Sequence, residues 1–346
     1  MFALFFNFLL ICLFGIVNAE ETTLFNVEQL TSPMMGFEKA GEAYFSPDGR
    51  KIIFQGVPKG ENNYQIYTMD LDTKKIVKIS QGAGACTCSY FSPDGKKIIF
   101  AASPEIALPA APGTYKWDLT PFMNIYEANV DGTEAVALTQ GPAYHAECAY
   151  SPDGSQIVYA SDEDGSMNIY VMKRDGSDVR QLTQTTHCYN GGPFFSPDGT
   201  KIVFRADREI PNFLQIYTMD IDGENLVQLT NNHAVNWAPF WHPSGQAIAY
   251  TTSVHGHHNY QIYLLNVETG GQYQVTDYPT FNGLPTFNRD GTKLLWTSKR
   301  GKDNTSQVFI ANFNMPKEWL QNDTEIGSEE GHQAKAYNFS VRILPQ

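Results

Sequence analysis

A turn motif recurs six times along this 346-residue chain at nearly constant intervals. Its core is Ser-Pro-Asp-Gly, placed between an aromatic residue and an apolar run, as in YFSPDGRKIIF and FFSPDGTKIVF. A sustained period in the forties, with β-type residues throughout, predicts a ring of repeated blades rather than a series of independent domains. The turn positions lie 46, 59, 45, 46 and 46 residues apart and are Asp48, Asp94, Asp153, Asp198, Ser244 and Asp290.

Each copy of the motif reads as a tight β-hairpin. The aromatic strand ends at Ser-Pro because proline donates no backbone hydrogen bond. Asp-Gly then makes the turn, since glycine accepts a positive φ angle. The next strand, of the Lys-Ile-Ile-Phe type, is apolar at most positions, which is typical of a strand covered on both faces.

A third strand, such as LQIYTMDID, follows each hairpin, and a fourth, such as LVQLT, completes five of the six copies. The sixth copy has no fourth strand after Asn314, but the segment NVEQLT, from Asn26 to Thr31, matches the missing piece. The sequence therefore predicts an all-β, six-bladed β-propeller of four-stranded blades, in which the N-terminal strand completes the last blade. Such closure removes the open sheet edges of a linear array.

The hairpin and the Ile-Tyr-x-Met-Asp-x-Asp-Gly strand resemble the repeats of the TolB-like propeller family. The resemblance extends over residues 26–314 and implies a stand-alone propeller without the α/β domain that precedes the propeller in TolB itself. The same repeat occurs in propellers of prolyl-oligopeptidase-like enzymes, but no Gly-x-Ser-x-Gly nucleophile motif follows here. Oligogalacturonate lyases are a third relative, in which histidines of a TolB-like propeller bind a metal.

The two ends of the chain are expected to lie outside the propeller. Residues 2–17 are almost entirely apolar, and small residues at Val17 and Ala19 precede a cleavage position before Glu20. We interpret residues 1–19 as a secretory signal peptide, with a membrane anchor as the alternative, and expect a periplasmic or secreted protein. The propeller then comprises residues 20–314 and a C-terminal tail comprises residues 315–346.

Charge and cysteine content limit the partners. The formal net charge is −13, which repels phosphate backbones, so we expect no nucleic acid partner. A protein partner, a carbohydrate or another small ligand agrees better with this surface, and the chain is expected to be monomeric.

Cleavage of the signal would leave four cysteines, which allow two disulfides or none: Cys86, Cys88, Cys148 and Cys188.

Equivalent positions of the repeat should form rings around the channel of a propeller. Eight residues before the turn, four copies carry His145, Asn190, Asn236 and Asn282, and six residues before it two copies carry Glu42 and Glu147. Imidazole, amide and carboxylate groups can bind a ligand, and Glu42, Glu147 and His145 could hold a divalent ion such as calcium or manganese. Ordered water is the alternative occupant of such a channel.

The longest insertion, in the second repeat, contains Tyr115 and Trp117 on a proline-rich segment. Aromatic residues on a stiff loop could contact a partner or a sugar, or the loop could cover its own channel.

Because a propeller does not define a function, two hypotheses about the function of this chain remain open. The first is an exported, non-enzymatic binding or scaffolding propeller of the cell envelope. The alternative is a metal-dependent carbohydrate lyase or hydrolase acting in the channel.

Overall fold

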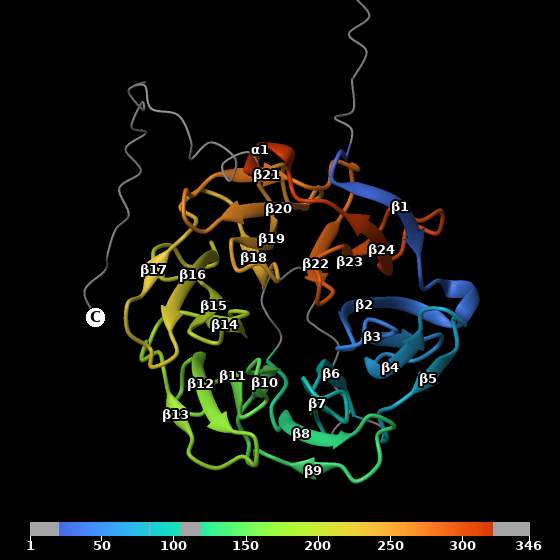
Figure 1. Cartoon of the computed structure of the whole chain (residues 1–346). Coiled ribbons are helices and arrows are strands. Elements are labelled where there is room, and N and C mark those ends of the chain that lie inside the picture. The colour runs from blue at the N-terminus through green and yellow to red at the C-terminus, as the bar shows by residue number, and fades with distance from the viewer. Residues whose placement is uncertain (1–20, 83, 105–118, 321–346) are drawn as a thin grey trace, which may run out of the picture.

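Six four-stranded antiparallel sheets surround a central axis like the blades of a propeller (Figure 1). The computed structural model describes residues 21–82, 84–104 and 119–320. In five blades the innermost strand comes first in the sequence and the strands that follow lie progressively farther out, whereas in the sixth blade the outermost strand is the N-terminal one (Figure 1). The predicted fold class, including the number of blades and of strands in each blade, is confirmed.

The inner strands form the wall of the channel. From blade one to blade six, they are β2 (Phe37–Phe45), β6 (Cys86–Phe91), β10 (His145–Tyr150), β14 (Asn190–Phe195), β18 (Asn236–Trp241) and β22 (Asn282–Phe287). The second strands are β3 (Lys51–Pro58), β7 (Lys97–Ala102), β11 (Gln156–Ser161), β15 (Lys201–Ala206), β19 (Ala247–Thr252) and β23 (Lys293–Ser298).

The third and fourth strands form the outer half of each blade. The third strands are β4 (Gln65–Asp70), β8 (Asn124–Asn129), β12 (Asn168–Lys173), β16 (Gln215–Asp220), β20 (Gln261–Asn266) and β24 (Gln307–Phe313). The fourth strands are short, except in blade six: β5 (Ile76–Lys78), β9 (Val136–Ala137), β13 (Arg180–Gln181), β17 (Val227–Gln228), β21 (Gln272–Gln274) and β1 (Leu24–Gln29). Two short helices flank the propeller, η1 (Pro33–Met35) and α1 (Lys317–Leu320).

The N-terminal strand closes the ring, as predicted. Strand β1 pairs antiparallel with β24, so that the beginning of the described chain lies beside its end (Figure 1). Beyond the strand, the Leu30 N–H donates to the Val308 carbonyl at 2.8 Å, and the buried Thr31 hydroxyl donates to Gln307 Oε1 at 2.7 Å. The pairing begins two residues earlier than predicted and contains a bulge at Asn26, whose φ is 54°. A bulge on an outer edge hinders further strand addition.

A pair of aromatic rings recurs in every blade, stacked in five blades and tilted in blade five, and explains why two positions of the repeat are aromatic. The last aromatic residue of the Lys-Ile-Ile-Phe strand packs against the tyrosine or phenylalanine of the Ile-Tyr strand, with ring centroids 5.6–6.2 Å apart. Phe54, Tyr159, Tyr217 and Trp296 are less than 2% exposed in these stacks. The core is therefore divided among the blades and their interfaces, as expected for a repeat fold.

The hairpin motif builds its own hydrogen-bond network. The Ser46 hydroxyl donates to Asp48 Oδ1 at 2.6 Å and accepts from the Lys51 N–H at 2.9 Å, and Gly49 has a φ of 68°. The same contacts recur at Ser92 and Ser196. Hydrogen bonds from the serine hydroxyl hold the pKa of the Asp48 carboxyl below its usual value. The motif therefore stabilises the hairpin turn through its own hydrogen bonds.

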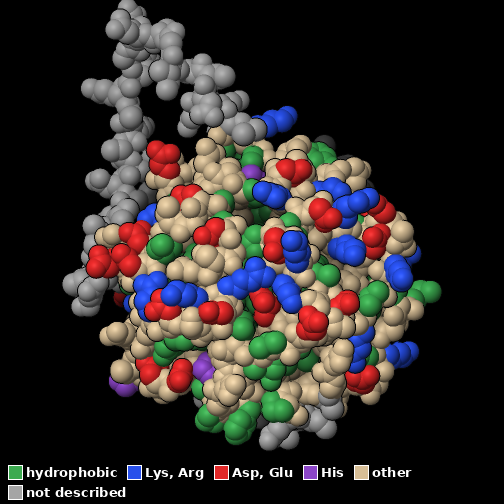
Figure 2. Space-filling model, turned by 60° about the horizontal axis from the view of Figure 1, so that its bottom comes forward, with side chains coloured by type: hydrophobic (Ala, Val, Ile, Leu, Met, Phe, Trp, Pro, Cys, Tyr) green, Lys and Arg blue, Asp and Glu red, His purple; other side chains and the backbone are tan. Residues whose placement is uncertain are grey.

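The surface of the propeller shows acidic and basic side chains interleaved on the side visible in Figure 2. The negative net charge is therefore not gathered into one patch on that side. Among the described residues, no helix is long and apolar enough to cross a membrane. The proposed signal peptide, residues 1–19, lies outside the described residues.

Candidate functional site

A bulge at the same place in all six inner strands turns one residue per blade toward the channel. The pairing between first and second strands shifts there in every blade. A positive φ angle, between 46° and 58°, marks the bulged residue in each case, and these residues are Glu42, Cys88, Glu147, Gly192, Ala238 and Leu284. All six line one cavity on the axis, with a volume of about 280 Å³. Six-fold repetition thus brings distant segments together at a single site.

Aromatic rings form the floor of this cavity. Tyr44 lies 5.0 Å from Tyr90 and 5.8 Å from Phe194, and Phe194 lies 5.1 Å from Phe240, measured between ring centroids. These four rings come from four different blades and meet across the axis. Beyond them, the Ser-Pro turns line a second cavity of about 470 Å³, which also touches Tyr90, Phe194 and Phe240. The channel is therefore divided, and the first cavity ends blindly at the aromatic floor.

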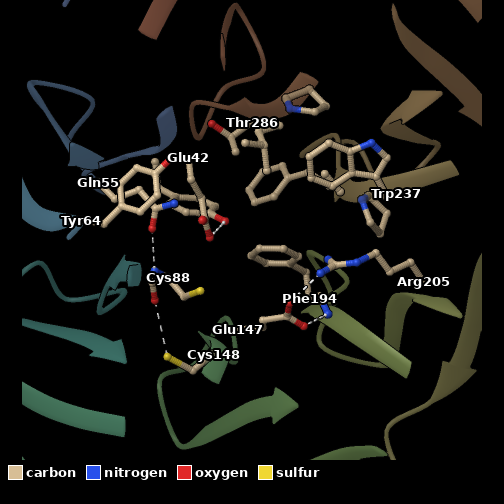
Figure 3. Close-up of a pocket in the computed structure, with 17 residues that line it drawn as sticks. Glu42, Gln55, Tyr64, Cys88, Glu147, Cys148, Phe194, Arg205, Trp237 and Thr286 are labelled. Atoms are coloured by element: carbon tan, nitrogen blue, oxygen red, sulfur yellow. Dashed lines mark hydrogen bonds and ion pairs between the residues drawn. The ribbon is translucent and has the colours of Figure 1, made fainter. Parts of the chain in front are cut away.

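One carboxylate of the cavity is fully engaged by the protein. Glu147, on β10, pairs with the Arg205 guanidinium of β15 at 2.5 Å (Figure 3). It also accepts from the Tyr189 hydroxyl at 2.9 Å and from the Gly192 N–H at 2.6 Å. The two charged side chains are only 12% and 8% exposed. Arg205 also donates to the Tyr189 hydroxyl at 2.8 Å. The pair joins blade three to blade four.

The repeat explains why Glu147 occupies this place. In three other blades, a side chain of the preceding blade's second strand accepts the N–H of the bulged residue. The Glu42 N–H donates to Thr297, the Cys88 N–H to Gln55 and the Leu284 N–H to Thr251, at 3.0–3.2 Å. Blade three carries an alanine, Ala160, at that position, and the Glu147 carboxylate accepts the Gly192 N–H in its place.

The other carboxylate, Glu42, has no counter-ion. Among the described residues, Glu42 belongs to no ion pair. The Tyr44 hydroxyl donates to it over a long 3.4 Å, and the Cys88 side chain also forms a hydrogen bond with it. Burial and the nearby charge of Glu147 raise the pKa of Glu42 to about 7, against a smaller opposing effect of Arg205. A carboxylate whose pKa is displaced to neutrality in a cavity is a candidate for a functional group.

Glu42 should make the protein less stable as the pH rises from about 4.5 to about 7. Folded Glu42 holds its proton more tightly than the unfolded chain does, so its stabilising contribution is complete below the unfolded pKa and is lost as the pH approaches 7. A shift of this size corresponds to about 3 kcal/mol. Chemical denaturation of the wild type and Glu42→Gln at several pH values measures it. Equal pH dependence in both proteins would contradict the assignment.

The other ring of predicted site residues does not line the cavity. The amides of Asn190, Asn236 and Asn282 donate to Met167 O, Gln215 Oε1 and Gln261 Oε1 of the preceding blade, at 2.9–3.1 Å. His145 Nδ1 lies 3.0 Å from the Ser161 hydroxyl. All four side chains are buried. The two rings do not both face the channel, because the bulge interrupts the strand alternation that would place residues two apart on the same side.

The described residues do not fit a metal site. Across the described ranges, no group of three His, Cys, Asp or Glu side chains lies close enough together to hold an ion. Glu147 is committed to Arg205, and His145 is bonded within its blade. The expectation that Glu42, Glu147 and His145 converge on an ion is therefore not met by their geometry. The four described cysteines are free, and Tyr115 and Trp117 lie outside the described residues.

The predicted ring contained Glu42 and Glu147 but missed Arg205 and Trp237, which complete the cavity (Figure 3). A signal for Arg205 was present in the repeat. At its position in the second strand, the other copies carry uncharged residues, namely Gln55, Ala101, Ala160, Thr251 and Thr297. One charged residue at an otherwise uncharged, buried repeat position indicates a buried ionic partner.

The ring of six four-stranded sheets and its blind axial cavity define a six-bladed β-propeller. A family model described as the TolB beta propeller domain matches residues 119–209 and 215–320, which is more than half of the chain. The chain belongs to this family.

Solved structures agree on the fold. An Agrobacterium tumefaciens protein provisionally named TolB superposes with a TM-score of 0.58 at 21% identity, covering 80% of this chain and 91% of that one. TolB from Acinetobacter baumannii gives 0.55 at 17% identity, covering 81% of this chain and 65% of that one. An oligogalacturonate lyase in complex with manganese superposes with a TM-score of 0.55 at 16% identity, covering 85% of this chain and 94% of that one. At such identities the likeness concerns the fold alone.

Proposed function

We propose that this protein is an exported, non-enzymatic binding propeller and that the blind axial cavity is its ligand site. The observation that carries the proposal is the state of Glu42, a carboxylate without a counter-ion in an aromatic-walled cavity. Deep, mostly apolar concavities with a few polar groups are the usual form of small-ligand sites. The apolar N-terminal run and the small residues before Glu20 support export. A periplasmic or extracellular location follows from it.

The arrangement supports binding better than catalysis. A lyase or hydrolase needs a base near a group that stabilises the developing charge. Glu147 and Arg205 neutralise each other at close range, which leaves Glu42 without a catalytic partner among the described cavity residues. The structural likeness to oligogalacturonate lyases nevertheless makes metal-dependent carbohydrate cleavage the alternative that a test must address.

A thermal-shift panel tests this proposal. We expect at least one small ligand among neutral sugars, amino acids, amines and short peptides to raise the melting temperature by mass action. Trp237→Ser should abolish the shift because Trp237 lines the cavity. Tyr278→Ser, at an aromatic residue that is 48% exposed and outside the cavity, should retain it.

Two further measurements use the same preparation. Polygalacturonate incubated with the protein and manganese or calcium should yield no unsaturated product, and a metal-dependent increase in its ultraviolet absorbance would instead support the lyase alternative.

N-terminal sequencing of the exported protein should find Glu20 as the first residue. Retention of Met1 would contradict the signal-peptide assignment.

A further inference from the structure

The charged side chains of the cavity leave it with an excess of negative charge when Glu42 is ionised. Glu147 and Arg205 cancel, so ionised Glu42 leaves the cavity with one net negative charge. The remaining titratable groups around Glu42 do not change this result. Burial raises the pKa of Cys88, Cys148, Tyr44 and Tyr90 above their usual values, so that all four are neutral near physiological pH. A ligand that compensates this charge must be a cation.

Several aromatic side chains line the cavity together with Glu42. Tyr44, Phe194, Trp237 and Phe240 all line the cavity, and Phe194 and Trp237 lie opposite Glu42 across it (Figure 3). Aromatic faces attract an organic cation through the ring quadrupole, and do so more strongly when water is excluded. A fifth ring, Tyr64, already has the Lys39 ammonium 4.7 Å above its centroid. Metal ions and anions gain little from such walls.

The size of the cavity limits the ligand. A volume of about 280 Å³ lies just below the roughly 300–1,000 Å³ typical of sites for drug-sized ligands. The aromatic floor prevents a ligand from passing through to the second cavity. The site therefore suits one small cationic group that enters from the mouth with its charge directed at Glu42.

We propose that the axial cavity binds an organic ammonium group, held between the Glu42 carboxylate and the aromatic faces of Tyr44, Phe194, Trp237 and Phe240. This inference rests on the proposed binding function and adds the chemical class of the ligand. The ammonium could belong to a free alkylamine or to a lysine side chain of a partner, since the chemistry at Glu42 is the same in both cases. Recognition combines one ion pair with cation–π contacts.

Isothermal titration calorimetry with matched probes tests this inference. The free-amine probe is butylammonium, its uncharged counterpart is butanol, and the side-chain probe is an N-acetylated Gly-Lys-Gly amide with the norleucine peptide as its counterpart. We expect the ammonium of each pair to bind at least tenfold more tightly than the uncharged analogue. Tighter binding of the peptide than of butylammonium identifies a partner's lysine as the source, and the reverse identifies a free amine.

Two variants separate the charge from the cavity. Glu42→Gln keeps the shape and should reduce ammonium binding at least tenfold, whereas Glu268→Gln, at an exposed surface position, should bind as the wild type does. If Glu42→Gln fails to fold, Trp237→Leu provides the second variant, and it should weaken ammonium binding more than butanol binding. Equal affinity for butylammonium and butanol would overturn the inference.

The outcome also distinguishes this inference from the proposed function. Binding of a neutral sugar that is lost in Trp237→Ser, together with no preference for ammonium, would leave the binding function intact and reject the cation. If the wild type bound none of the tested ligands in the cavity, both the ammonium inference and the proposed binding function would be rejected.

Discussion

Deletion of residues 21–31 is expected to lower the melting temperature by about 10 °C or more, or to leave the protein aggregated. The deletion removes β1, two buried leucines and the buried hydrogen bond between Thr31 and Gln307. Each buried leucine contributes about 1.5–3 kcal/mol, and each kcal/mol moves the midpoint of a large domain by roughly 2–4 °C. The loss also exposes the edge of β24, which favours intermolecular pairing.

Point substitutions in the same segment provide the matched controls. Leu30→Ala removes a side chain that is 2% exposed and should cost about 2–5 kcal/mol. Met34→Ala, at a side chain that is 98% exposed, should have no measurable effect. A synthetic peptide of residues 21–32 should bind the truncated protein and restore part of its stability by mass action. A truncated protein that melts with the wild type would show that β1 does not close the ring.

The number of blades and the closure could be predicted because both are periodic properties of the chain. The six evenly spaced hairpin motifs and the one displaced fourth strand can be recognised in the amino-acid sequence alone. The exact start of β1 could not, because the bulge at Asn26 shifts the pairing, and a bulge at a non-glycine residue has no clear signature in residue type.

The candidate site was predictable in part for a similar reason. Repeat alignment identified Glu42 and Glu147 as equivalent positions, and equivalent positions of a ring must lie near one another. It could not show that His145 and Asn190 turn into the blades, because the positive φ of Glu147 and its counterparts breaks the expected alternation. The pairing of Glu147 with Arg205 depends on contacts between blades, which the pattern within one repeat does not contain.

Replacement of Arg205 by methionine is expected to destabilise the protein by about 3–5 kcal/mol. The substitution leaves the Glu147 carboxylate buried without its counter-ion, and breaking one side of a buried ion pair carries such a cost. Adding Glu147→Gln should recover much of the loss, since no uncompensated charge then remains. Lys173→Met, which breaks an ion pair whose partners are each 59% exposed, should cost less than about 1 kcal/mol. Urea denaturation of the wild type, Arg205→Met, Glu147→Gln and the double variant gives the coupling between Arg205 and Glu147.

Gly192 offers an independent check on the same contact. A Cβ atom at Gly192 would clash with Arg205 Nη1, which the buried ion pair holds in place, so Gly192→Ala should strongly destabilise the wild type. The backbone itself does not forbid alanine, because Ala238 occupies the equivalent bulge in the next blade with a φ of 49°. Gly192→Ala should therefore cost much less when Arg205 has been shortened to alanine, although the positive φ will retain part of the penalty. If Gly192→Ala were equally costly with and without the arginine side chain, the backbone of the bulge, rather than the space needed by the ion pair, would be what requires glycine there.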